Sequence, residues 1–203
     1  MSIFDLNKAK KSSESNPLLP GLRGIKLTEV ISKEFESKSG DTQNIIEFKF
    51  NGVSPDSGYY SETFFESNFD RDSAFNSSKT DEEFEKMTER TISKLRTIID
   101  KFILIEVLPS GKNFKDLCNK IAQLFVDDTS WKEIEGQIKL VYSGKDKIIT
   151  PGFKFLSTPL DKEVLSITKS KYDRITPLPA PDTEAAFKSL SDDFDEKDDE
   201  PLF

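Results

Sequence analysis

The segment Thr80-Asp-Glu-Glu-Phe-Glu-Lys-Met-Thr-Glu-Arg90, with its continuation to Phe102, has the pattern of an amphipathic helix. Thr80 and Glu83 have the spacing of a capping box, in which Thr80 is the N-cap and Glu83 reaches back to it. The positions that follow the 3.6-residue period of one helical face are Phe84, Met87, Thr91, Leu95, Ile98, Ile99 and Phe102. We predict that Pro109-Ser-Gly111 ends this helix.

A second amphipathic helix is predicted over residues 113–126. Its apolar positions are Phe114, Leu117, Ile121, Leu124 and Phe125, and Cys118 lies on the same side. The chain therefore has a helical pair at its centre, and its fold depends on what flanks this pair.

Strand patterns precede and follow the helices. Residues 24–36, 45–50 and 59–65 are predicted to form a three-strand antiparallel meander, with a bulge near Val30-Ile31 where the alternation changes phase. After the helices, residues 137–142 and 147–150 predict a hairpin that turns at 143–146, followed by 151–155 and an edge strand at 165–168.

This order predicts a β-rich α+β domain. Three strands, a helical element and two further strands form the order of an OB fold, a five-stranded Greek-key barrel. Here a helical pair is inserted between strands 3 and 4, and other α+β arrangements share the same order. We expect the domain to span residues 21–176, between a flexible N-terminal arm (1–20) and a Pro-rich spacer with a disordered acidic tail (177–203).

Composition narrows the classes of function. The 203 residues include one cysteine and no histidine, which excludes an internal disulfide, a multi-cysteine zinc site and every Ser-His or Cys-His pair. We therefore expect a non-enzyme without metal or cofactor. The enzymatic alternative is a metal held by paired acids such as Asp127 and Asp128. No segment approaches the roughly 18–20 apolar residues of a membrane span, and a cytoplasmic location is expected.

Charge is concentrated at the C-terminus. Residues 182–203 contain nine acids and two lysines, and so carry −7 of the net charge of −8. The remainder of the chain is close to neutral, so net charge by itself does not predict a nucleic-acid surface.

Lysines and aromatic residues lie close together in several predicted strands. Binding of single-stranded nucleic acid needs cations along the phosphates and flat rings beneath the bases. The candidates for phosphate contact are Lys26, Lys33, Lys49, Lys139, Lys145, Lys147 and Lys154. The candidates for base stacking are Tyr59, Tyr60, Trp131 and Tyr142. Most of the 17 phenylalanines are expected in the core.

The chain ends Asp198-Asp-Glu-Pro-Leu-Phe203. This ending resembles the acidic, Phe-terminated tails of bacterial and phage single-stranded DNA-binding proteins. The resemblance implies a protein that coats single-stranded DNA without sequence preference during phage replication, recombination and repair. It also implies that Asp198, Asp199, Glu200, Pro201, Leu202 and Phe203 recruit a polymerase, helicase or nuclease.

The N-terminal cluster Lys8-Ala-Lys-Lys-Ser-Ser13 resembles a motif by which some phage helix-destabilising proteins associate along DNA. It is the basis for expecting self-association on DNA. The alternative is a virion, assembly or other interaction protein whose acidic tail keeps it soluble or mimics nucleic acid. Such a protein would have no affinity for DNA.

Overall fold

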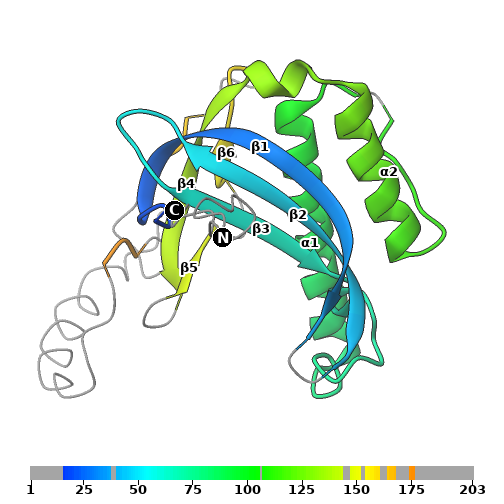
Figure 1. The fold of residues 1–203 in the computed structure, drawn as a ribbon. Helices are drawn as coiled ribbons and strands as arrows, with labels where there is room; N and C mark the ends of the chain where they lie inside the picture. The colour runs from blue at the N-terminus through cyan, green and yellow to red at the C-terminus, as the bar shows by residue number, and fades with distance from the viewer. Residues whose placement is uncertain are drawn as a thin grey trace, which may run out of the picture.

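The protein is a mixed α+β fold in which an antiparallel sheet packs against two helices (Figure 1). The computed structural model describes residues 16–37, 40–105, 107–143, 147–151, 154–160, 164–167 and 174–176. The strands are β1 (Gly21–Glu36), β2 (Thr42–Gly52), β3 (Tyr59–Phe65), β4 (Glu135–Ser143), β5 (Lys147–Ile149) and β6 (Leu156–Ser157). The helices are α1 (Asp81–Phe102) and α2 (Phe114–Asp127), with short 3-10 turns η1 (Glu66–Asn68) and η2 (Ser130–Glu133). The predicted helical pair between the third and fourth strands is confirmed.

The sheet has the order β3-β2-β1-β4-β5, and β6 also pairs with β4. β1 is at the centre because it pairs with β4 through residues 21–26 and with β2 through residues 25–36. It curves strongly between these two neighbours (Figure 1). No main-chain pairing joins β3 to β5 in the part of the chain that is described, so the sheet is open and the closed barrel that was predicted is not seen.

The bulge in β1 lies earlier than predicted. The register with β2 shifts between Leu27 and Glu29, and Thr28 Oγ1 donates a hydrogen bond of 3.1 Å to the carbonyl of Lys49. After the bulge Val30 is opposite Phe48. Val30 therefore faces the core and Ile31 faces away from it, although the two neighbouring apolar residues had suggested a bulge at that point.

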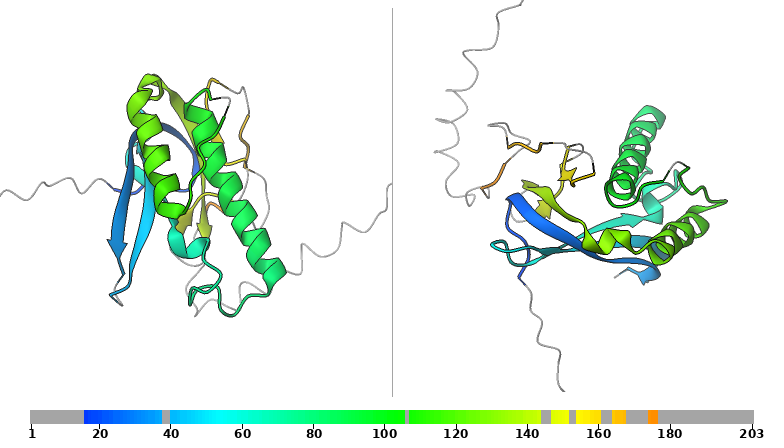
Figure 2. Two further views of the ribbon diagram at one scale, coloured as in Figure 1. Left: turned by 90° about the vertical axis from the view of Figure 1, so that its right-hand side faces the viewer. Right: turned by 90° about the horizontal axis from the view of Figure 1, so that it is seen from above.

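The helices cover one face of the sheet (Figure 2). Phe48 of β2 contacts Phe125 of α2 with ring centres 5.8 Å apart, and Phe50 contacts Phe102 of α1 at 6.1 Å. These rings are buried, so the hydrophobic contact between sheet and helices forms the main core.

The start of α1 confirms the capping box, but its end differs from the prediction. Glu83 N donates to Thr80 Oγ1 at 3.2 Å, and Thr80 N donates to the Glu83 carboxylate at 2.8 Å. The helix ends at Phe102, because the chain becomes extended at the buried Ile103. Thr158 Oγ1 donates to the Lys101 carbonyl at 2.8 Å, so a tertiary contact satisfies this helix end.

Other elements follow the prediction more closely. α2 starts after Asn113, whose side chain accepts from Asp116 N at 2.8 Å, and β4 and β5 form the predicted hairpin. The edge pairing expected at 165–168 is instead made by Leu156–Ser157, and residues 164–167 have no strand structure.

The N-terminal part of the described chain is attached to the domain. Leu18 is buried in the core, and its N–H donates to the Tyr59 carbonyl at 2.8 Å, so residues 16–18, assigned to the arm by sequence, pack against the sheet. The remainder of the arm (1–15), Lys145 and the tail (177–203) lie outside the described residues.

Candidate nucleic-acid interface

The face of β1, β2 and β3 that points away from the helices is covered by no described element and faces the viewer in Figure 1. We call this surface the open sheet face. The strand register arranges its side chains in rows across three strands. Those rows are Lys26-Asn51-Tyr59, Glu29-Lys49-Ser61, Ile31-Glu47-Thr63 and Lys33-Ile45-Phe65. Three of the predicted phosphate-binding lysines and one predicted stacking residue therefore share one surface.

Aromatic rings lie at both ends of the open sheet face. Tyr59, at the beginning of β3, is 44% exposed. At the other end Phe35, 39% exposed, contacts Phe65 edge to face with ring centres 5.8 Å apart. Phe35 and Phe65 were not predicted as site residues, because their exposure depends on which face of the sheet the helices cover.

Two of the lysines on this face are held in ion pairs. Lys33 Nζ lies 2.9 Å from Glu47, and Lys49 Nζ lies 2.8 Å from Glu29. The hydrogen bond that Lys49 donates to Glu29 raises the pKa of Lys49. The Lys49–Glu29 pair is exposed and contributes about 0–1 kcal/mol, so a phosphate can replace Glu29 at little cost.

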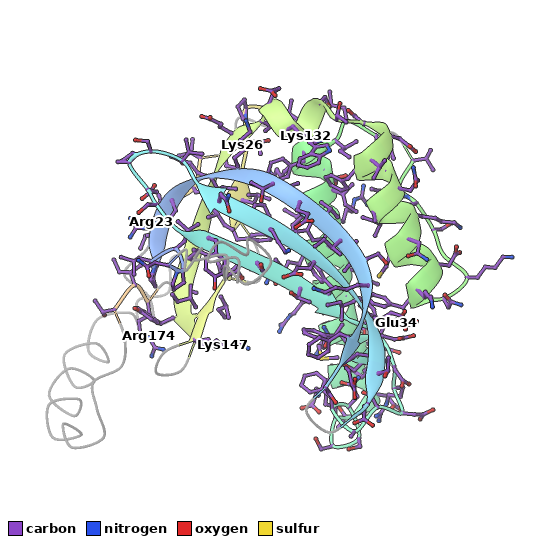
Figure 3. All side chains as sticks on the ribbon, viewed as in Figure 1. Arg23, Lys26, Glu34, Lys132, Lys147 and Arg174 are labelled. Carbon is purple, nitrogen blue, oxygen red and sulfur yellow. The ribbon has the colours of Figure 1, made fainter. Side chains whose placement is uncertain are left out.

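Lys26 is the least constrained of the three lysines. It has no ion-pair partner among the residues that the structure describes. Figure 3 shows it at the crest of β1, near Lys132 of η2. Glu135 is its cross-strand neighbour on β4.

Two predicted site residues, Trp131 and Lys139, lie in the interior, and a third, Tyr60, is half-buried on the helix side of the sheet. Trp131 is 4% exposed and its Nε1 donates to the Phe125 carbonyl at 2.8 Å. Lys139 is 8% exposed and its Nζ donates to the Ser166 carbonyl at 3.1 Å. Tyr60 faces the helices and stacks on Phe50 at 6.5 Å. The predictions for Trp131 and Lys139 are therefore wrong, and Tyr60 does not belong to the open sheet face.

The remaining predicted residues that the structure describes lie in the β4–β5 hairpin or, for Lys154, shortly after it. Tyr142 is half-buried, and its N–H donates to the Arg174 carbonyl at 2.8 Å. Lys147 is exposed at the beginning of β5, near Arg174 and well away from Lys26 (Figure 3). Lys154 is also exposed, with a positive φ of 51°. The structure thus separates the hairpin residues from the open sheet face.

A half-buried polar cluster links β3 with α1 and with the residue that follows β5. The Glu62 carboxylate accepts hydrogen bonds from Tyr60 Oη at 2.6 Å, Thr150 Oγ1 at 2.8 Å and Lys94 Nζ at 2.8 Å. Burial, together with the Glu62 charge, raises the pKa of Tyr60 well above its usual range. Lys94 thus joins α1 to the sheet.

A groove of about 680 Å³ runs between β3 and α1. We call it the β3–α1 groove. The four cations in its lining are Lys79, Lys86, Arg90 and Lys94, and the two acids are Glu62 and Glu83. The groove was not predicted from the sequence, although the four-residue spacing of Lys86, Arg90 and Lys94 puts them on one side of a helix.

The paired acids Asp127 and Asp128 have local roles. Asp127 accepts from the Gln123 amide at 2.7 Å, and Asp128 accepts from Ser130 N at 2.8 Å. The hydrogen bonds from Ser130 lower the pKa of Asp128. Within the described ranges, no cluster of three or more His, Cys, Asp or Glu side chains has the arrangement of a metal site. None of the helices described there has the length and apolarity needed to cross a membrane.

No protein-family model matches the chain, and no curated protein matches it significantly. The function is therefore argued from the sequence and the site alone.

Proposed function

We propose that the protein binds single-stranded DNA without sequence preference, through the open sheet face. The observation that carries this proposal is the row arrangement, with Lys26, Lys33 and Lys49 between Tyr59 at one end and Phe35 and Phe65 at the other. Cations that follow a strand's phosphates and rings that stack on its bases are the two components of such binding. Both lie on one surface that no described element covers.

The topology supports relating the sheet to the OB fold. OB domains use the face of strands 2 and 3 for oligonucleotides, and the open sheet face includes β2 and β3. In the order β3-β2-β1-β4-β5, a barrel would close between β3 and β5. Thr150, directly after β5, already donates to Glu62 of β3 through its side chain.

The resemblance of the C-terminus extends the proposal to a cellular role. The protein would coat unwound DNA in phage replication, recombination and repair, in the host cytoplasm, and would associate with itself along the strand. The segment 198–203 would recruit a polymerase, helicase or nuclease, with Phe203 as the apolar anchor. No catalytic step is assigned to it.

The test is fluorescence anisotropy with labelled oligo-dT across a salt series. Lys26→Gln with Lys49→Gln removes two charges from the open sheet face, and Arg96→Gln with Lys112→Gln removes two from exposed helix and loop positions elsewhere. If both lysines contact phosphates, their loss lowers the slope of log affinity against log salt by about 1.4, since each contact contributes about 0.7 for a single strand. The control pair should keep the wild-type slope.

Either of two results would overturn the proposal. Wild-type protein that does not bind oligo-dT at low salt would favour the virion or assembly alternative. Equal losses in the two double variants would show attraction by net charge and not a site on the sheet.

A further inference from the structure

The outer edge of β3 has main-chain groups that no described residue pairs with. Leu18 N donates to Tyr59 O at 2.8 Å, and Tyr59 N donates to Asn16 O at 2.9 Å, so the peptide groups of Tyr59 point away from β2. Because this direction alternates along a strand, the N–H and C=O of Ser61 and Thr63 point the same way. β3 is the last strand of the sheet on this side. An unpaired edge of this kind is a template for another strand.

This free edge borders the β3–α1 groove. Thr63 and Phe64 form one wall of the groove, and Met87, Arg90 and Thr91 of α1 form the other. A groove between a sheet edge and a helix suits an extended peptide, which pairs its main chain with the edge and places alternate side chains against the helix.

The helix wall selects acidic side chains. Lys86 and Arg90 are four residues apart on one side of α1, about 6 Å along the helix axis, whereas Lys94, one turn further on, is already paired with Glu62 at 2.8 Å. An acidic side chain that an added strand places against the helix would therefore meet Lys86 or Arg90, both of which line the groove. Arg90 has no hydrogen-bond or ion-pair partner in the described part of the chain, and Lys86 has only the exposed Glu82.

We propose that the β3–α1 groove binds an extended acidic segment of a partner protein, as an added strand on β3. Nucleic acid is less suited to it, because the edge offers carbonyl acceptors in alternation with N–H donors and phosphates accept only. The chain's own acidic tail is not the occupant assigned. The tail is the alternative occupant, and the tail variant described below separates it from a partner segment. The inference does not depend on DNA binding by the open sheet face.

The probe is a fluorescein-labelled hexapeptide of alternating Glu and Val, and the control probe alternates Lys and Val. Full-length protein should bind the acidic probe and not the basic one. Lys86→Glu with Arg90→Glu should weaken binding about tenfold, which corresponds to about 1.4 kcal/mol. Arg96→Glu with Lys112→Glu makes the same change in net charge outside the groove and should leave binding unchanged.

A second pair of variants tests the added strand itself. Thr63→Pro removes an N–H that points away from β2 and leaves the β2–β3 pairing intact, so it should abolish probe binding. Thr63→Val keeps that N–H and should bind as wild type. On binding, the Thr63 amide should also become protected from hydrogen exchange. Binding that survives Thr63→Pro without protection would overturn the added strand.

Two further arms identify the occupant. Oligo-dT affinity should be unchanged in the Lys86→Glu, Arg90→Glu variant. A parallel loss of DNA affinity would reassign the groove to nucleic acid. Changing Asp192, Asp193 and Asp195 to Asn in the full chain should leave probe affinity unchanged. Tighter binding in that variant would assign the groove to the chain's own tail and overturn the assignment to a partner.

Discussion

The ring of Tyr59 is the best-placed stacking surface on the open sheet face, since it is exposed and lies in the same row as Lys26. We expect Tyr59→Ala to weaken oligo-dT binding by about 1–3 kcal/mol, the usual value of one stacked base. Tyr59→Phe keeps the flat ring and should bind as wild type. Anisotropy titrations at one salt concentration compare the three proteins. If all three bind equally, Tyr59 is not part of the site.

For single residues, the sequence shows residue types and their alternation, but it does not show which side chains are buried by other segments of the chain. Lys139 alternates with Ile138 and Leu140 like any surface lysine, yet the segment around Ser166 folds over it. Trp131 has a polar N–H that suits a surface position, but the Phe125 carbonyl satisfies it inside the core. Lys139 is buried by a segment distant in sequence, and Trp131 is buried by its contact with the second helix. No local sequence pattern indicates either contact.

At the level of elements, the beginning of α1 provides a stability test. Thr80→Ala removes the side chain that accepts from Glu83 N and should destabilise the protein by about 1 kcal/mol, measured by urea unfolding. Thr80→Ser retains the acceptor and should be close to wild type. An unchanged midpoint for Thr80→Ala would show that this cap contributes nothing to global stability.

The same cap should make stability depend on pH. The pKa of Glu83 is lowered below 4.5 mainly by the hydrogen bond from the Thr80 backbone N–H, and further by the one from the Thr80 side chain. The carboxylate's contribution is therefore complete above the pKa of the unfolded chain and is lost as the pH falls through the lower pKa of folded Glu83. Unfolding of wild type and Glu83→Gln should differ near neutral pH and converge in acid. A difference independent of pH would contradict this.

Helix starts and helix ends were not equally predictable. The start of α1 is specified by two residues three positions apart, so the sequence contains the whole signal. Its end at Phe102 depends on Ile103 entering the core and on Thr158 reaching the Lys101 carbonyl. Pro109 and Gly111 are residues that strongly terminate helices, but α1 has already been ended by packing at Phe102 before the chain reaches them.

For the whole molecule, the order of strands and helices along the chain was predictable, but whether the sheet closes into a barrel was not. The alternation of apolar residues gave the three strands before the helices and the hairpin after them, and hence the sequence of elements. Whether β3 and β5 meet depends on the curvature of β1, which its bulge and its two different partners set together. The same curvature leaves the edge of β3 free beside α1 and so creates the groove that no motif indicated.

The distribution of charge over the chain leads to a prediction at the same scale. Residues 182–203 carry −7, whereas the remainder contains 28 acids and 27 bases. A tethered segment with this charge competes with DNA for the lysines of the open sheet face at a high effective concentration. A chain ending at Ala180 should therefore bind oligo-dT more tightly at low salt. The gain should shrink as salt rises, because the Debye length falls from about 10 Å at 0.1 M to about 3 Å at 1 M.

A chain ending at Glu200 keeps every acid and should bind like the full chain. If removal of the last three residues alone gave the full gain, the competition would come from the terminal Phe203 and not from charge.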